Sequence, residues 1–142
     1  MVESEHPLAR FVDAQAPVWE EVLSELRSGR KTSHWMWFVF PQLASLGRSA
    51  TARFYGLRDV QQARAYIDHP LLGRRLIECC ELLSVSPVRD AVQIFGSVDA
   101  MKLRSCLTLF AAAAPEHTVF RECLMKFYGG EPDALTVQQL GL

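Results

Sequence analysis

The sequence lacks the features that mark several large classes of protein. No apolar run approaches the 18 or so residues that cross a bilayer. Residues 1–11, MVESEHPLARF, lack the basic start and apolar core of a signal peptide. We therefore expect a cytoplasmic protein with no membrane partner. An excess of one charge is also missing, because 15 Lys and Arg balance 16 Asp and Glu, so we expect no specific nucleic-acid binding.

Common metal and catalytic motifs are missing too. The four cysteines, Cys79, Cys80, Cys106 and Cys123, form no CxxC pair and have no zinc-finger spacing with histidine. Without a secretion signal, such thiols normally fill small gaps in a core. The patterns GxGxxG, GxxxxGK[ST], GxSxG and HExxH do not occur. We expect no metal and no cofactor, and the sequence leaves open whether the protein is an enzyme.

What is present points to one helical domain. A chain of 142 residues fits a single ordinary domain, and at this size roughly 68% of the unfolded surface is buried on folding. Apolar residues recur at helical spacing, and no segment shows sustained apolar and polar alternation. The sequence therefore predicts an all-α fold over residues 1–142. We expect a single compact domain of about six to eight helices, with its core in about residues 7–140.

Local signals place most of these helices. Gly29 is a natural C-terminal stop, and Asp59 followed by Gln62 has the form of a capping box. Ser86 before Pro87 resembles an N-cap and first turn, and Ser97 resembles the N-cap of the longest helix. The expected helices are residues 8–14, 18–28, 60–68, 71–84, 87–95, 98–114, 115–128 and 134–140.

One segment stands out, GRKTSHWMWFVFPQLASLGRS at residues 29–49. Its six consecutive apolar residues, 35–40, include two of the three tryptophans. Periodicity cannot distinguish so short a run from a buried strand, but Ser33 as an N-cap and Pro41 as a stop favour one or two helical turns. Burying four large aromatic side chains removes about 600–1,000 Å² from water, so we expect the run to organise the core. Trp35 and Trp37 are either core residues or pocket-lining residues.

Charge is unevenly distributed along the chain. Residues 1–26 carry one Arg and six acids, residues 27–75 carry nine bases and two acids, and residues 76–142 carry five bases and eight acids. The structural interpretation is that these segments pack together and their opposite charges pair. The functional interpretation is an anion-binding site in the basic middle segment, residues 27–75.

The residues around the aromatic run supply a candidate binding site. A Trp37 ring at a pocket rim could stack on a ligand, and Lys31, like the nearby Arg30 and Arg48, could neutralise a phosphate or carboxylate. His34 could accept or donate a proton near neutral pH, and Gln42 could orient a ligand. Asp99 and Lys102 suit ordinary helix electrostatics, but the same helix start could bind an anion. The candidate ligand-binding residues are Lys31, His34, Trp37, Gln42, Asp99 and Lys102.

Three hypotheses follow for the function. The leading one is binding of a small anionic or nucleotide-like ligand, in a pocket between the tryptophan-rich segment and the helix that begins at Ser97. The alternative is a protein-interaction or structural module in which the aromatic segment is mostly core. The third is a small hydrolase or transferase that uses His34 with Asp99 as general acid and base.

Several strings also support a family resemblance: residues 29–49, then FYGL, AYIDHPLLGRRL, IFGSVDAMKLRSCLTLF and FYGGEPDALT. From about residue 11 to 139 the chain resembles a bacterial family catalogued as domain of unknown function 1810. The resemblance implies a compact, mainly helical single domain without an assigned activity or catalytic residues. Members often carry the label calpastatin, which does not fit, because inhibitors of that kind are long, repeated, unfolded chains.

Overall fold

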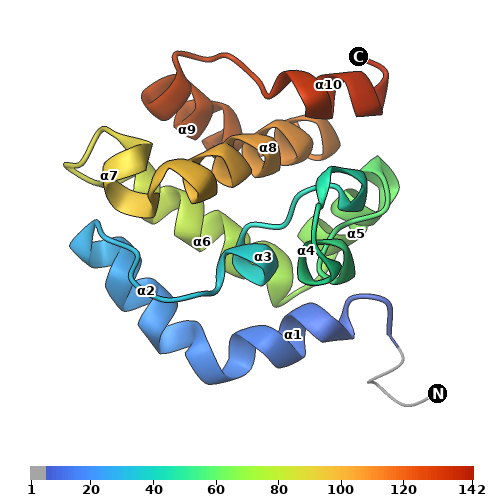
Figure 1. The fold of residues 1–142 in the computed structure, drawn as a ribbon, viewed down its shortest axis with the longest axis horizontal. Helices are drawn as coiled ribbons and strands as arrows, with labels where there is room; N and C mark the ends of the chain where they lie inside the picture. Colours follow the sequence, from blue (N-terminus) through green and yellow to red (C-terminus); the bar gives the residue numbers. More distant parts are fainter. Residues whose placement is uncertain (1–5) are drawn as a thin grey trace.

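A computed structural model describes residues 6–142, and within that range it contains helices and loops with one isolated bridge between Leu43 and Leu57 (Figure 1). The predicted all-α fold and single compact domain are confirmed. Seven of the helices are α1 (Ala9–Gln15), α2 (Trp19–Ser28), α5 (Val60–Asp68), α6 (Leu72–Val85), α8 (Ser97–Ala113), α9 (Val119–Tyr128) and α10 (Ala134–Leu140). The shorter ones are α3 (Met36–Val39), α4 (Ala50–Phe54) and α7 (Ala91–Phe95), with 3-10 turns η2 (Ala16–Val18) and η3 (Ala44–Leu46).

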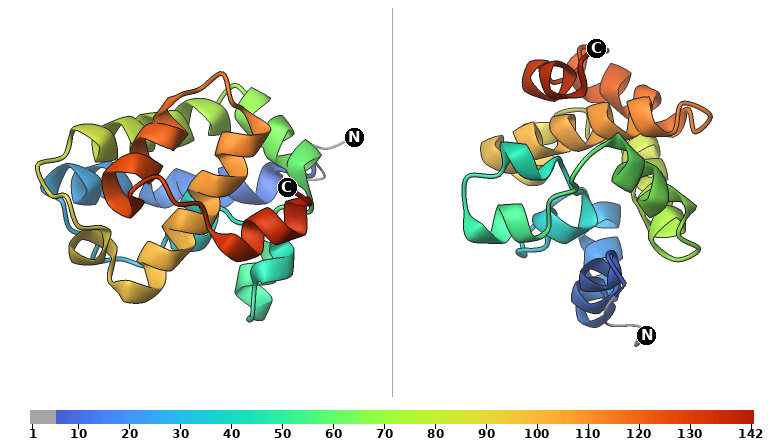
Figure 2. Two further views of the ribbon diagram at one scale, coloured as in Figure 1. Left: turned by 90° about the horizontal axis from the view of Figure 1, so that it is seen from above. Right: turned by 90° about the vertical axis from the view of Figure 1, so that its right-hand side faces the viewer.

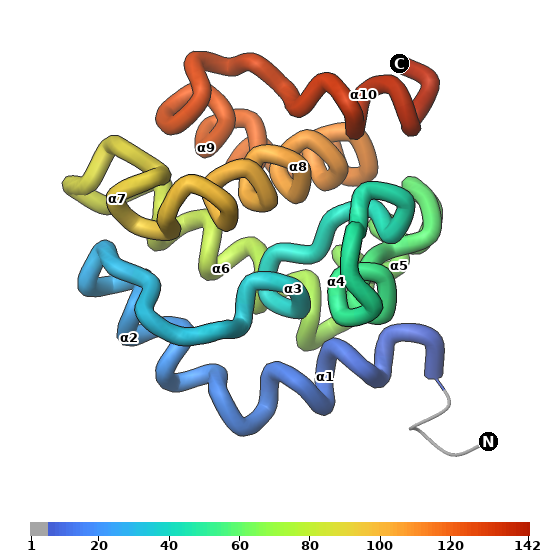
Figure 3. Tube along the Cα trace, in the orientation of Figure 1, coloured from blue at the N-terminus to red at the C-terminus, as the bar shows by residue number. Residues whose placement is uncertain are grey.

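Helices α6 and α8 lie at the centre of the molecule. Helix α8 packs against α5, α7, α9 and α10, and α6 packs against α2, α5 and α9. Helices α1 and α2 lie along one side and α9 and α10 along the opposite side, with the segment from α3 to α4 beside α8 (Figures 2 and 3). This arrangement places the tryptophan-rich segment between the α1–α2 side and α8. Within the described residues, no helix combines the length and apolar character needed to span a membrane.

Aromatic side chains form much of the core. The Phe110 ring of α8 lies 5.5 Å from the Tyr66 ring and 5.7 Å from the Phe120 ring, measured between centroids. In the tryptophan-rich segment, the Trp35 side chain is 1% exposed and Phe40 makes an edge contact with Phe95 at 5.8 Å. Such pairs add about 0.5–1.5 kcal/mol beyond the area they bury. The expectation that this segment organises the core is therefore met by Trp35 and Phe40.

Helix ends with local caps lie where the sequence predicts them. The Asp59 carboxylate accepts a hydrogen bond from the Gln62 N–H at 2.8 Å, and the Gln62 side chain accepts one from the Arg58 N–H at 2.7 Å. Gly29 ends α2 in the left-handed conformation, with φ of 75°. Helix α10 has the predicted bounds and begins after Asp133, which accepts from the Thr136 N–H. These ends depend on residues within one turn, which is why the sequence predicts them.

Four predicted helix starts are wrong. Helix α7 begins at Ala91 after the Asp90 cap and not at residue 87, although the Ser86 hydroxyl accepts a hydrogen bond from the Val88 N–H. Helix α9 begins at Val119 rather than at residue 115, and Ser97 is the first residue of α8 after Gly96 rather than its cap. Helix α3 begins after Trp35, because the Ser33 hydroxyl is directed to Glu25 and not to the helix.

Gly73, near the start of α6, shows why the sequence alone misjudges some glycines. At that position a Cβ atom would lie 1.9 Å from the carbonyl oxygen of Ile67. The glycine therefore lets the start of α6 pass directly over the end of α5. In isolation a helical glycine costs about 1 kcal/mol relative to alanine, but here the close approach outweighs that cost.

Candidate functional site

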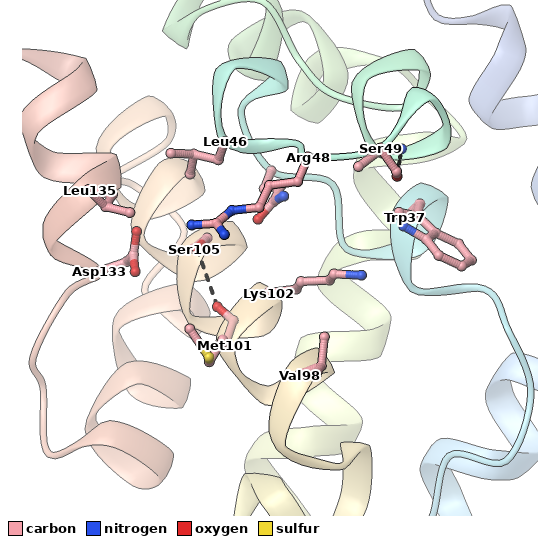
Figure 4. Close-up of a pocket in the computed structure, with 12 residues that line it drawn as sticks. Trp37, Leu46, Arg48, Ser49, Val98, Met101, Lys102, Ser105, Asp133 and Leu135 are labelled. Carbon is pink, nitrogen blue, oxygen red and sulfur yellow. Dashed lines mark hydrogen bonds between the residues drawn. The ribbon is translucent and has the colours of Figure 1, made fainter.

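A cavity of about 480 Å³ lies between the tryptophan-rich segment, α4, α8 and the start of α10 (Figure 4). This volume falls within the range of small-molecule sites. Its walls are mostly apolar, with a few polar and charged groups. The lining residues are Trp37, Gln42, Leu46, Arg48, Ser49, Ala52, Val98, Met101, Lys102, Ser105, Asp133 and Leu135.

Helix α8 supplies one continuous wall. Val98, Met101, Lys102 and Ser105 are spaced by three, one and three residues, which places all four on one face of a helix. Val98 and Met101 are 65% and 71% exposed, although both are apolar. Both side chains face the cavity rather than the core, whereas Lys102 on the same face of α8 lies over the Trp37 ring.

The opposite wall is an excursion of the chain between residues 43 and 57. Its two ends are joined by hydrogen bonds from the Ala44 N–H to the Leu57 oxygen at 2.7 Å and from the Leu57 N–H to the Gln42 oxygen at 2.9 Å. Gly56 permits this approach, because a Cβ there would lie 2.3 Å from the Cα atom of Ala44. Compact loops with close ends of this kind are frequently functional. The excursion carries Leu46, Arg48, Ser49 and Ala52 to the cavity.

A buried carboxylate holds the loop that leads to α3. Glu25 is 8% exposed and accepts hydrogen bonds from the N–H groups of Thr32 at 2.8 Å and Ser33 at 3.1 Å. It also accepts from the Ser33 hydroxyl at 2.6 Å and from Trp35 Nε1 at 3.1 Å. Burial alone would raise the pKa of Glu25, but these hydrogen bonds to its charged form lower the pKa to about 2. The charged Glu25 thereby fixes the backbone just before Trp37.

A chain of charged contacts connects this loop to α8. The Lys31 ammonium lies 2.9 Å from the Asp99 carboxylate, and its side chain is only 7% exposed. Lys31 also donates to the Ser33 carbonyl and lies over the Trp35 ring. Asp99 is in turn 3.8 Å from Lys102 Nζ, which sits 4.9 Å from the centroid of the Trp37 ring. The Lys31–Asp99 contact therefore ties the loop before α3 to the first turn of α8.

Arg48 is the cation most available to a ligand. Its side chain is exposed and forms no hydrogen bond or ion pair with any residue in 6–142. The guanidinium extends into the cavity toward the Leu46 and Ser105 side (Figure 4). The Gln42 side-chain amide likewise has no hydrogen-bond partner among residues 6–142. An unpaired guanidinium and an unpaired amide beside apolar walls can bind an oxygen-bearing ligand.

Three of the six predicted site residues meet at the cavity: Trp37, Gln42 and Lys102. Lys31 and Asp99 do not line it, and they pair with each other as described above. His34 is an exposed loop residue away from the lining. The two tryptophans have different positions: Trp35 is buried in the core, and Trp37 is half-buried and lines the cavity.

Sequence reasoning missed most of the remaining lining residues. Arg48 lies in the cavity lining although it is not among the six candidate residues, and α10 contributes Leu135, which the sequence does not indicate. The spacing of residues 98, 101, 102 and 105 was an available signal, because it predicts one helix face that mixes apolar and polar side chains. Asp133 and Leu135 had no such signal, since only the tertiary fold brings them beside Arg48.

The cysteines are buried in the core, away from this cavity. All four thiols are free and inaccessible. Burial raises the pKa of the Cys79 and Cys106 thiols well above the ordinary range. Within residues 6–142, no three His, Cys, Asp or Glu side chains are grouped as metal ligands would be.

Comparisons with known proteins identify the family of this chain. The profile of the family described as "Protein of unknown function (DUF1810)" matches residues 5–140. The crystal structure of Rv1873, a conserved hypothetical protein from Mycobacterium tuberculosis, is similar with a TM-score of 0.93 and 50% sequence identity. That match covers 95% of this chain and 96% of the other. Among curated proteins, none matches the chain. With nearly its whole length matched, the chain belongs to the DUF1810 family of proteins of unknown function.

Proposed function

We propose that this protein binds a small organic anion in the cavity between the tryptophan-rich segment and α8. The observation that carries the proposal is Arg48, an unpaired guanidinium directed into a cavity with mostly apolar walls. The Arg48 side chain is exposed, so its charge is hydrated, and no described protein group competes with a ligand for it. A ligand that carries one anionic group on an apolar body satisfies both parts of this cavity.

The polar and the apolar lining residues would contact different parts of the ligand. Arg48 offers a planar fork that fits the two oxygens of a carboxylate, and Gln42 offers one donor and one acceptor to orient the ligand. Leu46, Met101 and Leu135 provide apolar contact area for the rest of the molecule. Burial of that area contributes about 25 cal/mol per Å², so affinity depends on the apolar body as well as on the charge.

The interaction-module hypothesis remains the second candidate, and one observation favours it. Val98, Met101 and Leu135 are each more than half exposed at the mouth of the cavity. Exposed apolar side chains grouped in this way mark binding surfaces for proteins as well as for small ligands. The acid–base hypothesis for His34 and Asp99 stays a prediction, and it has less support because Asp99 is engaged by Lys31.

The test uses 2-naphthoate, an apolar ring system with a single carboxylate, as the probe. Isothermal titration at 25 °C compares the wild-type protein with Arg48→Met, which keeps the length of the side chain and removes its charge. A hydrogen bond to a charged group contributes about 1.5–3 kcal/mol. We therefore expect Arg48→Met to weaken binding about 10- to 100-fold.

Arg53→Met is the matched control. Arg53 is an exposed arginine five residues away on α4, and it does not line the cavity. We expect this variant to bind 2-naphthoate as tightly as the wild type does. Equal weakening by both substitutions, or no binding of the probe to the wild-type protein, would contradict the proposed site.

A further inference from the structure

The charged residues at the cavity nearly balance each other. Its lining contains two cations, Arg48 and Lys102, and one carboxylate, Asp133. Lys102 also lies 3.8 Å from Asp99, whose charge is already matched by Lys31 at 2.9 Å. The balance left for a ligand is therefore a single positive charge. A ligand with two negative charges would bring one uncompensated charge into a mostly apolar site, which is costly.

Two of the helix starts beside the cavity are capped by their own side chains. They are at Ser49 before α4 and at Asp133 before α10, whereas α8, whose second residue Val98 also lines the cavity, has no side-chain cap. At the first, the Ser49 hydroxyl accepts the hydrogen bond of the Ala52 N–H at 3.1 Å. At the second, the Asp133 carboxylate accepts from the Thr136 N–H at 2.9 Å and from its hydroxyl at 2.7 Å. Phosphate sites usually depend on free N–H groups at a helix start, and at these two starts a side-chain oxygen already occupies one of them.

Resting on the proposed function, we infer that this cavity selects monocarboxylates with an apolar body and discriminates against phosphate esters, nucleotides included. The single unpaired guanidinium of Arg48 matches the two oxygens and one charge of a carboxylate. Asp133 sits at the same cavity and repels any second negative charge. Selectivity therefore comes from the near balance of charges, whereas affinity comes from Arg48 and the apolar walls.

Three probes with the same ring system separate charge from shape. They are 2-naphthoate, 2-naphthyl phosphate and the neutral 2-naphthamide, titrated into the wild-type protein at pH 7.5 in 0.15 M salt. At this pH the phosphate ester carries close to two negative charges, because its second pKa is about 6. We expect 2-naphthoate to bind at least about tenfold more tightly than either of the other two probes.

A charge variant tests the reason for this selectivity. Asp133→Asn keeps the helix cap, because asparagine caps as well as aspartate does, and it removes the carboxylate from the lining. We expect 2-naphthyl phosphate to bind this variant at least about threefold more tightly than it binds the wild type. Asp90→Asn is the matched control, because Asp90 caps α7 in the same way and does not line the cavity. It should leave all three affinities unchanged.

The outcomes of these titrations distinguish a failure of the carboxylate selectivity from a failure of the proposed anion binding. If none of the probes binds to the wild-type protein, the proposed function itself fails. If 2-naphthyl phosphate or 2-naphthamide binds within about tenfold of 2-naphthoate, or more tightly, the site stands and the carboxylate selectivity is overturned. If Asp133→Asn leaves the ratio of the two affinities unchanged, the charge balance is not its cause and the inference is overturned in that form.

Discussion

Replacement of Glu25 by glutamine tests how the loop before Trp37 is held. Glutamine keeps the shape of the side chain but removes its negative charge. The carboxylate oxygen that accepts hydrogen bonds from Thr32, Ser33 and Trp35 is then replaced by a weaker, neutral acceptor. The substitution also turns one acceptor oxygen into an N–H₂ group, which faces the Ser33 hydroxyl. We therefore expect Glu25→Gln to destabilise the folded protein and to loosen the backbone that leads to α3.

The pKa of Glu25 sets the size of the effect. The pKa falls from its ordinary 4.5 to about 2 in the folded protein. Such a shift corresponds to about 3 kcal/mol of folding free energy at neutral pH. Because the folded pKa is the lower one, this stability is present above pH 4.5 and is lost as the pH falls toward 2. At pH 3 we expect the difference between wild type and Glu25→Gln to shrink to about 1.5 kcal/mol.

The assay is urea unfolding of both proteins at pH 7 and pH 3, followed by circular dichroism. Glu20→Gln is the control, because Glu20 is exposed on the same helix and forms no hydrogen bond or ion pair with residues 6–142. We expect the control to lie within about 0.5 kcal/mol of the wild type at both pH values. A Glu25→Gln defect of the same size at pH 7 and pH 3 would refute the reasoning, because the effect would then not depend on the charge.

Three further predictions concern the core and the helix ends. Lys126 Nζ donates to the carbonyl oxygens of Leu83 at 2.7 Å and Ser86 at 2.6 Å at the end of α6, so Lys126→Met should cost about 1–3 kcal/mol in urea unfolding. Gly73→Ala should lower the unfolding free energy by at least about 2 kcal/mol, because the added methyl meets the Ile67 oxygen; a gain in stability would contradict that close approach. The four buried thiols should react with a thiol reagent such as dithionitrobenzoate only after unfolding, and rapid labelling of the native protein would show that the core opens readily.

Local signals account for the parts of the fold that the sequence predicts. Helix ends at Gly29, Asp59 and Leu140 depend on neighbours within one turn, and their positions are as expected. Ser86 and Ser33 carry equally good local signals, but no helix begins directly after either residue. The Ser86 hydroxyl accepts from the Val88 N–H as a cap would, yet the first helical residue is Ala91, and the Ser33 hydroxyl donates to Glu25. A hydroxyl that has two possible partners is assigned only by the tertiary structure.

For the candidate site, the sequence indicated the location of the pocket but not how its charged residues pair. The sequence indicated a pocket between the tryptophan-rich segment and α8, and the cavity lies there with Trp37 and Lys102 in its lining. The sequence could not show that Lys31 forms an ion pair with Asp99, because 68 positions separate the two residues in the chain. That pairing leaves Arg48 as the free cation among the lining residues, a role that depends on tertiary contacts.

The pinned excursion between residues 43 and 57 has a consequence for how this family can diversify. Its neck is closed by two backbone hydrogen bonds, which do not depend on the side chains inside the loop. Substitutions or changes of length between those bonds should alter one wall of the cavity while the helical scaffold stays intact, since loop closure costs little per added residue. Under the proposed function, exchange of this segment with that of the mycobacterial relative should change which ligands the cavity accepts while the helical scaffold is retained, in the way that antibody loops carry specificity on a constant framework.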